Sequence, residues 1–126
     1  MEVVTALMVK PGEQPFITQL CDTTGYLNYA VSMGTTYQCT ATAVQLEKDI
    51  VVIFARDGVM FGLEGNRLVK GRIIAGTFYV VKVKNGKLCS LNDDELTRYA
   101  LRFRSVEYFD EDDVFESGVD AMFSLL

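Results

Sequence analysis

Apolar residues recur along much of this chain with the spacings that are typical of β-strands. Residues 3–9 (VVTALMV) form a β-branched, apolar run that ends at the turn signal Lys10-Pro11-Gly12, and residues 14–20 resume the pattern. Residues 50–55 (IVVIFA) are apolar without interruption, as in a strand that is buried on both faces. We therefore predict a hairpin over residues 3–20 and a central strand at residues 50–55.

Further strand patterns follow in the middle of the chain. Residues 37–46 alternate over most of their length, which is typical of a strand with one wetter face. A turn at Arg56-Asp57-Gly58 predicts a short return strand at residues 59–63. Gly76 interrupts an apolar pattern and indicates a bulge or a close backbone approach. We expect other strands at residues 68–74, 78–83, 88–91 and 106–109.

Three segments carry the spacing of amphipathic helices. In residues 93–104, Asn92 and Glu95 have the spacing of a capping box, and arginines near the end suit the helix dipole. A shorter helix is expected after Asp22 or one of the threonines that follow it. The third lies in the acidic segment 106–126, where five apolar residues share one face: Phe115, Val119, Met122, Phe123 and Leu126.

These elements together predict an α+β fold. We expect a mainly antiparallel sheet of about five to seven strands, covered on one face by two or three helices. The strand and helix patterns do not alternate regularly enough for a doubly wound fold. A length of 126 residues predicts a single domain, residues 1–126, whose last part, residues 106–126, is an acidic amphipathic segment.

The composition excludes several kinds of chemistry. The chain has no histidine, so it lacks the commonest metal ligand and the base of Ser-His and Cys-His systems. Cys21, Cys39 and Cys89 are widely spaced, as expected for reduced thiols in a cytoplasm. No apolar run approaches the roughly 20 residues of a membrane span, and no signal peptide is indicated. We expect a cytoplasmic, non-enzymatic protein without catalytic residues, metal, cofactor or membrane contact.

The formal net charge of −5 is unevenly distributed along the chain. Residues 1–104 carry 12 basic and 10 acidic side chains, whereas residues 105–126 carry seven acidic side chains and no basic one. An acidic protein is poorly suited to contact nucleic acid directly, because phosphate contacts need clustered Lys and Arg. The acidic segment is instead suited to a basic partner surface.

The stretch GLEGNR at residues 62–67 is a candidate ligand site. Its backbone N–H groups and Arg67 could hold an anion, although the pattern is neither a Walker loop nor a dinucleotide loop. Arg98 and Arg102, spaced i and i+4, could join Asn66 and Arg67 in a positive patch. The alternative is structural: Asn66 caps a turn, Arg67 pairs with a nearby acid, and the two helical arginines are solvated.

The C-terminal segment is a candidate partner site. The acidic run Asp110, Glu111, Asp112 and Asp113 could meet a basic partner, or it could simply be a solvated loop that caps the last helix. It lacks the alternating spacing of a Ca²⁺ loop. The apolar face of this helix, with Phe115, Val119, Met122 and Phe123, is expected either to dock on its own sheet or to meet another chain.

Four motifs appear in a series: MVKPGEQPFITQL, IVVIFARDGVMFGLEGNRL, IIAGTFYVV and CSLNDDELTRYALRF. This series resembles domain of unknown function (DUF) family 3846, whose members are carried by phages, conjugative elements and other mobile DNA. The resemblance covers about residues 7–105. It implies a small accessory protein of a mobile element in a bacterial host cell, and it carries over no catalytic residue.

Two hypotheses about function follow. In the first, the chain is a non-enzymatic accessory protein that binds, and inhibits, a host defence protein through its acidic surface. In the second, it is a homo-oligomer that sequesters a nucleotide-like anion near Asn66 and Arg67.

Overall fold

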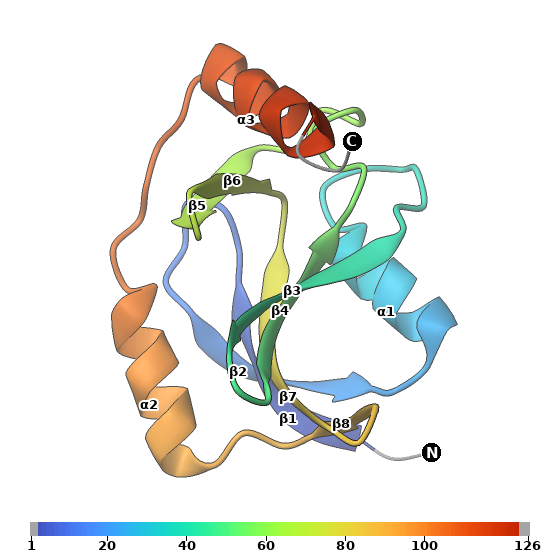
Figure 1. Ribbon diagram of the computed structural model, residues 1–126, viewed down its shortest axis with the longest axis vertical. Coiled ribbons are helices and arrows are strands. Elements are labelled where there is room, and N and C mark those ends of the chain that lie inside the picture. Colours follow the sequence, from blue (N-terminus) through green and yellow to red (C-terminus); the bar gives the residue numbers. More distant parts are fainter. Residues whose placement is uncertain (1–2, 124–126) are drawn as a thin grey trace.

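The computed structural model describes residues 3–123, and the side chains among them up to Gly118. Eight strands and three helices follow one another along these residues (Figure 1). Their order is β1 (Val3–Val9), β2 (Phe16–Cys21), α1 (Thr24–Val31), β3 (Ala41–Glu47), β4 (Ile50–Ala55), β5 (Gly65–Val69), β6 (Arg72–Ala75), β7 (Phe78–Lys84), β8 (Lys87–Cys89), α2 (Asp93–Arg102) and α3 (Glu111–Phe123).

The main sheet has six strands, and every pair in it is antiparallel. Its order is β2-β1-β7-β4-β3, and β8 pairs with the end of β7. Strands β1 and β2 form the predicted hairpin, with Val3 opposite Cys21. Strand β7 lies between β1 and β4, which explains why its residues are apolar on both faces. The predicted α+β class with a mainly antiparallel sheet is therefore confirmed.

Several predicted strand bounds are wrong, and turns explain the errors. Residues 59–62 form turns, Leu63 follows them outside any strand, and residues 106–109 are not a strand. The expected strand at 68–74 is two strands, β5 and β6, joined by a turn in which Lys70 (φ 51°) and Gly71 (φ 76°) are left-handed. Lysine seldom adopts this conformation, so the turn was not foreseen. Strands β5 and β6 form a separate two-stranded sheet, and β3 begins at Ala41, four residues later than expected.

The helices cover both faces of the main sheet, not one face as predicted. Along β1, Ala6 and Met8 belong to one apolar core, which also contains Ala30 and Val31 of α1. The alternating residues Leu7 and Val9 of β1 belong to a second core together with α2. Figure 1 shows α1 and α2 on opposite sides of the sheet. A sheet whose central strands are apolar on both faces requires this arrangement.

Helix α2 begins at the predicted capping box. Asn92 Oδ1 accepts from the Glu95 N–H at 2.9 Å, and Glu95 Oε1 accepts from the Asn92 N–H at 2.9 Å. Glu95 also forms an ion pair with Lys82 of β7, at 2.6 Å between Oε1 and Nζ. Burial alone would raise the pKa of Glu95, but the Asn92 N–H and the Lys82 ammonium outweigh it, and the pKa lies below its ordinary value.

This lowered pKa predicts a pH-dependent contribution to stability. Unfolded Glu95 binds its proton more tightly than folded Glu95, so the contribution is present above about pH 4.3 and is lost as the pH falls through the folded pKa. Glu95→Gln should therefore lower the free energy of unfolding at pH 7, and its difference from wild type should shrink below about pH 4. Urea unfolding across this range measures the difference. A difference between Glu95→Gln and wild type that stays the same size across this pH range would contradict the prediction.

Candidate functional site

The structure places Asn66 and Arg67 inside the protein, not on its surface. Both residues are completely buried. Asn66 Nδ2 donates to the Val9 carbonyl at 2.8 Å and to the Gly76 carbonyl at 2.9 Å, and its Oδ1 accepts from Arg67 Nη1 at 2.8 Å. Asn66 therefore ties β5 to the end of β1 and to the β6–β7 connection.

The guanidinium of Arg67 is held by backbone carbonyls of its own chain. Its Nε and Nη2 donate to the Phe103 carbonyl at 3.2 and 3.0 Å, and Nη2 also donates to the Glu13 carbonyl at 2.7 Å. Phe103 is the C-terminal cap of α2, where a positive charge stabilises the negative end of the helix dipole. Burial lowers the pKa of Arg67, and the charge of Glu107 opposes this shift. We refer to Asn66, Arg67 and their carbonyl partners as the buried clamp.

The buried clamp weighs against an anion site at these two residues. The amide and guanidinium groups of Asn66 and Arg67 point toward carbonyls of the protein, so a ligand would have to displace Phe103 or Glu13. Arg98 and Arg102, by contrast, are exposed on α2, and Arg98 Nη2 pairs with Glu47 Oε1 at 2.8 Å. The structure therefore does not assemble the four residues into one positive pocket. Their role in ligand binding stays a prediction.

The described part of the C-terminal segment docks on its own chain. Val114 of α3 is buried in the core, and Ser117 Oγ accepts from the Ile73 N–H of β6 at 2.9 Å. A Cβ atom at Gly65 would lie 2.7 Å from Val114 Cγ2, so this glycine lets α3 approach β5 closely. The side chains of Val119, Met122 and Phe123, three of the predicted partner residues, lie outside the described residues.

The acidic run at the start of α3 divides into two pairs with different surroundings. Asp110 Oδ1 accepts from the Asp113 N–H at 2.7 Å, and Asp113 Oδ2 accepts from the Asp110 N–H at 3.4 Å. These two residues therefore cap the helix, as the structural alternative proposed. Glu111 and Asp112 are exposed and line a groove beside the helix.

This groove lies between the start of α3 and the loop that leads into β5. It encloses about 490 Å³. Its lining combines three carboxylates with apolar side chains, and we call it the acidic groove: Glu64, Glu111 and Asp112 together with Val59, Leu63, Phe109, Val114 and Phe115. Phe115 is 63% exposed, although the nearby Val114 is buried. The sequence indicated Glu111, Asp112 and Phe115, but it gave no signal that residues 59–64 would lie against them.

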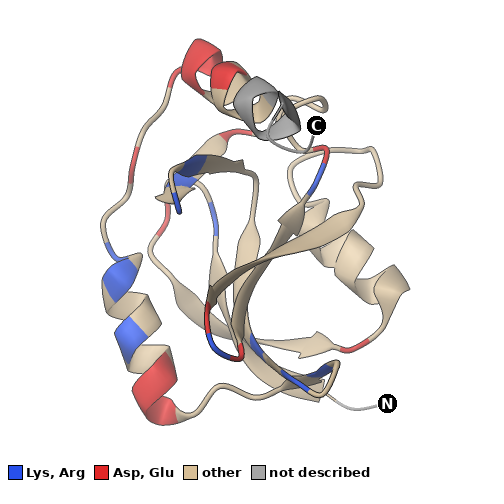
Figure 2. Ribbon diagram, in the orientation of Figure 1, with Lys and Arg blue, Asp and Glu red and all other residues tan. Residues whose placement is uncertain are grey.

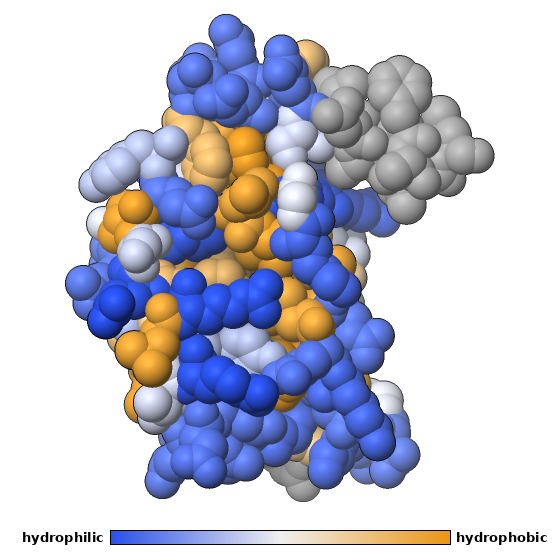
Figure 3. All heavy atoms as spheres, turned by 60° about the vertical axis from the view of Figure 1, so that its left-hand side comes forward, coloured by the Kyte–Doolittle hydropathy of each residue, from blue (hydrophilic) through white to orange (hydrophobic). Residues whose placement is uncertain are grey.

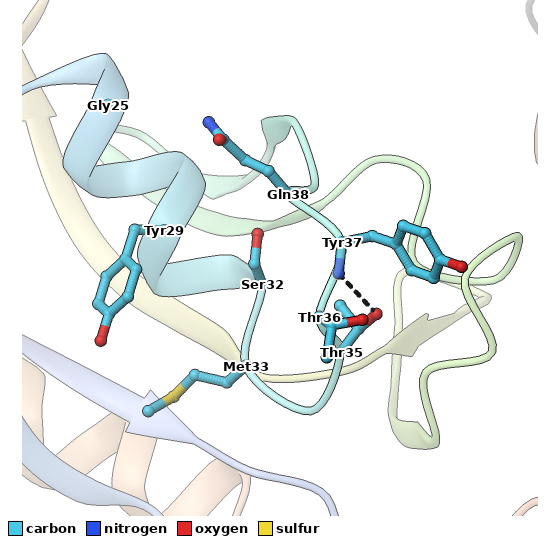
Figure 4. Close-up of a pocket in the computed structure, with 8 residues that line it drawn as sticks. All are labelled: Gly25, Tyr29, Ser32, Met33, Thr35, Thr36, Tyr37 and Gln38. Carbon is cyan, nitrogen blue, oxygen red and sulfur yellow. Dashed lines mark hydrogen bonds between the residues drawn. The ribbon is translucent and has the colours of Figure 1, made fainter.

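A second hollow lies beside α1 and has a different character. Figure 4 shows its lining residues, of which none is charged, and shows the rings of Tyr29 and Tyr37 pointing away from each other. Two of its polar side chains are engaged in local structure: Ser32 Oγ donates to the Asn28 carbonyl and accepts from the Cys39 N–H, and Thr35 Oγ1 accepts from the Tyr37 N–H. These bonds hold the α1–β3 connection in shape.

Fold and groove together define a small α+β protein with the acidic groove as its candidate site. The model of the family described as a domain of unknown function (DUF3846) matches residues 4–104, and the chain belongs to this family. Comparison with curated proteins and with solved structures gave no match. Among residues 3–123, no helix is long and apolar enough to cross a membrane.

Proposed function

We propose that this chain is a non-enzymatic accessory protein of a phage or another mobile element, and that it binds and inhibits a basic host protein through the acidic groove. The mobile-element setting rests on the family resemblance of the motifs quoted above. The observation that supports binding is the lining of the groove, which combines three carboxylates with apolar side chains that include the exposed Phe115.

The groove suits a particular kind of partner contact. The carboxylates of Glu64, Glu111 and Asp112 would attract Lys and Arg side chains and increase the association rate. The apolar floor and the exposed Phe115 would bury a large apolar side chain of the partner, and such central apolar contacts supply most of the affinity in protein interfaces. Capture of this kind needs no reacting group, which agrees with a chain that has no histidine.

Affinity capture from a bacterial lysate tests the proposal. The bait variant Glu64→Gln, Glu111→Gln, Asp112→Asn neutralises the groove and leaves the capping residues Asp110 and Asp113 intact. We expect at least a tenfold loss of the proteins that wild type enriches, measured by quantitative mass spectrometry. Phe115→Ala should also reduce the amount of captured protein, although it leaves the charge of the groove unchanged.

A matched control separates the groove from net charge. Asp49→Asn, Asp93→Asn, Asp94→Asn removes the same number of negative charges away from the groove, and it should capture what wild type captures. Equal capture by the neutralised groove and by wild type would overturn the proposal, as would the absence of any protein enriched over a blank matrix.

A further inference from the structure

Four basic side chains gather on the side of the molecule opposite to α1. Lys70 Nζ donates to the Gln45 carbonyl of β3 at 2.6 Å, and Arg98 of α2 pairs with Glu47, two residues further along the same strand. Arg72 lies over the Phe54 ring at 4.9 Å, and Arg102 follows Arg98 by one helical turn. We call Lys70, Arg72, Arg98 and Arg102 the basic face; among them only Arg98 forms an ion pair within the described residues.

The basic face also contains apolar surface. On β3, Leu46 lies between Gln45 and Glu47, the residues that Lys70 and Arg98 contact, and Val44 precedes them. Both apolar residues are half-buried and pack against the core. Figure 3 shows the left-hand side of Figure 1, where apolar side chains lie between strongly hydrophilic ones. A partner for this surface should therefore carry several negative charges and at least one large apolar side chain.

The start of α3 meets this description on the same chain. Asp110, Glu111, Asp112, Asp113 and Glu116 are exposed, and Phe115 projects among them. Figure 2 shows acidic residues at the start of α3 and in the first half of α2, and basic residues on β6 and in the second half of α2; the basic residue of β5 is the buried Arg67. Every basic residue of the chain precedes residue 105.

The geometry points to head-to-tail self-association, in which the acidic start of α3 of one copy binds the basic face of a second copy. The two surfaces are different patches of the molecule, so each copy can bind one neighbour through its acidic helix start and another through its basic face. Such a heterologous contact produces a ring if its rotation closes and an open chain if it does not. The inference goes beyond the proposed function, because a host partner and a second copy would compete for Glu111 and Asp112.

Sedimentation velocity of the full chain tests this inference. Wild type at low salt should show a sedimentation coefficient that rises with protein concentration, and 0.5 M NaCl should reverse the rise because it shortens the range of charge attraction. One reversed variant, Lys70→Glu, Arg102→Glu, changes charges on the basic face, and the other, Glu111→Lys, Asp112→Lys, changes charges at the start of α3. Each should weaken association at least tenfold. The control Lys84→Glu, Lys87→Glu changes exposed lysines elsewhere and should associate like wild type.

Mixing the two reversed variants gives the sharpest readout. Each reversed variant alone should associate at least tenfold more weakly than wild type, because the attraction between its two surfaces is lost. Lys70→Glu, Arg102→Glu leaves a basic face with no net charge, and Glu111→Lys, Asp112→Lys leaves a net charge of −1 at the start of α3. Their mixture pairs opposite charges again and should recover the assembly. A wild type that stays monomeric at all concentrations would overturn the inference, and so would association that neither reversal weakens. The basic-face variant should still capture the host partner, which separates failure of this inference from failure of the proposed function.

Discussion

Replacement of Arg67 by alanine is expected to lower the free energy of unfolding by about 3–5 kcal/mol, because buried acceptors lose their hydrogen bonds to a charged group and a cavity is left behind. The substitution leaves the Phe103 carbonyl without its two guanidinium donors and leaves Asn66 Oδ1 without its Nη1 partner. It also opens space where the largest completely buried side chain among the described residues stood. Equilibrium unfolding in urea measures the loss.

Two further variants distinguish the buried clamp from an anion site. Arg102→Ala removes an exposed arginine of α2 and should change the free energy of unfolding by less than about 1 kcal/mol. Arg67→Lys keeps the charge but loses the planar fork that reaches Phe103 and Glu13 together, so its stability should lie between wild type and Arg67→Ala. If Arg67→Ala were as stable as Arg102→Ala, the side chain would be free to serve a ligand.

Gly76→Ala should destabilise the protein by about 2–4 kcal/mol, because two penalties add. The backbone at Gly76 is left-handed, with φ +85°, which disfavours any side chain. The added Cβ would also lie 2.7 Å from Leu63 Cδ1, so Leu63 or the backbone must move. Urea unfolding at neutral pH measures the sum of both effects.

Gly71→Ala is the matched control for this substitution. Gly71 has a similar φ of +76°, but a Cβ there would meet nothing within 4 Å. It should therefore show only the backbone penalty, about 1 kcal/mol. The difference between the two variants isolates the steric contact between Gly76 and Leu63. Equal losses would show that the β6–β7 connection has room for a methyl group.

The periodic signals predicted those elements whose partners are close in sequence. The β1–β2 hairpin and the capping box of α2 depend on residues within a few positions of one another, so the pattern of residues 3–20 and the Asn92–Glu95 spacing predicted both. The β7–β8 turn was also foreseen, since Asn85 (φ 53°) and Gly86 (φ 76°) suit a tight hairpin. Gly76 was correctly expected to allow a close approach.

Long-range packing decided what the sequence could not predict. Arg67 was predicted to be an exposed ligand-binding residue because charged residues are rarely buried. No residue near it in the sequence indicates that the carbonyls of Phe103 and Glu13 would accept its hydrogen bonds. The acidic groove also depends on long-range packing, because Leu63 and Phe109 line it together although they lie far apart in the sequence. The apolar residues of 59–63 were likewise taken for a strand because a well-packed turn shows the same composition.

The positions of the clamp partners along the chain also bear on how this protein can be divided. The family model covers residues 4–104, so it begins in β1 and ends one residue after Phe103, the last partner of the guanidinium. A cut anywhere between Glu13 and Phe103 separates Arg67 from one of its acceptors. No residue after Arg104 takes part in the hydrogen bonds of Arg67 to Phe103 and Glu13. All residues of the clamp thus lie inside the part of the chain that the family model covers, whereas Val114 and Ser117, which fasten α3 to the same fold, lie beyond it.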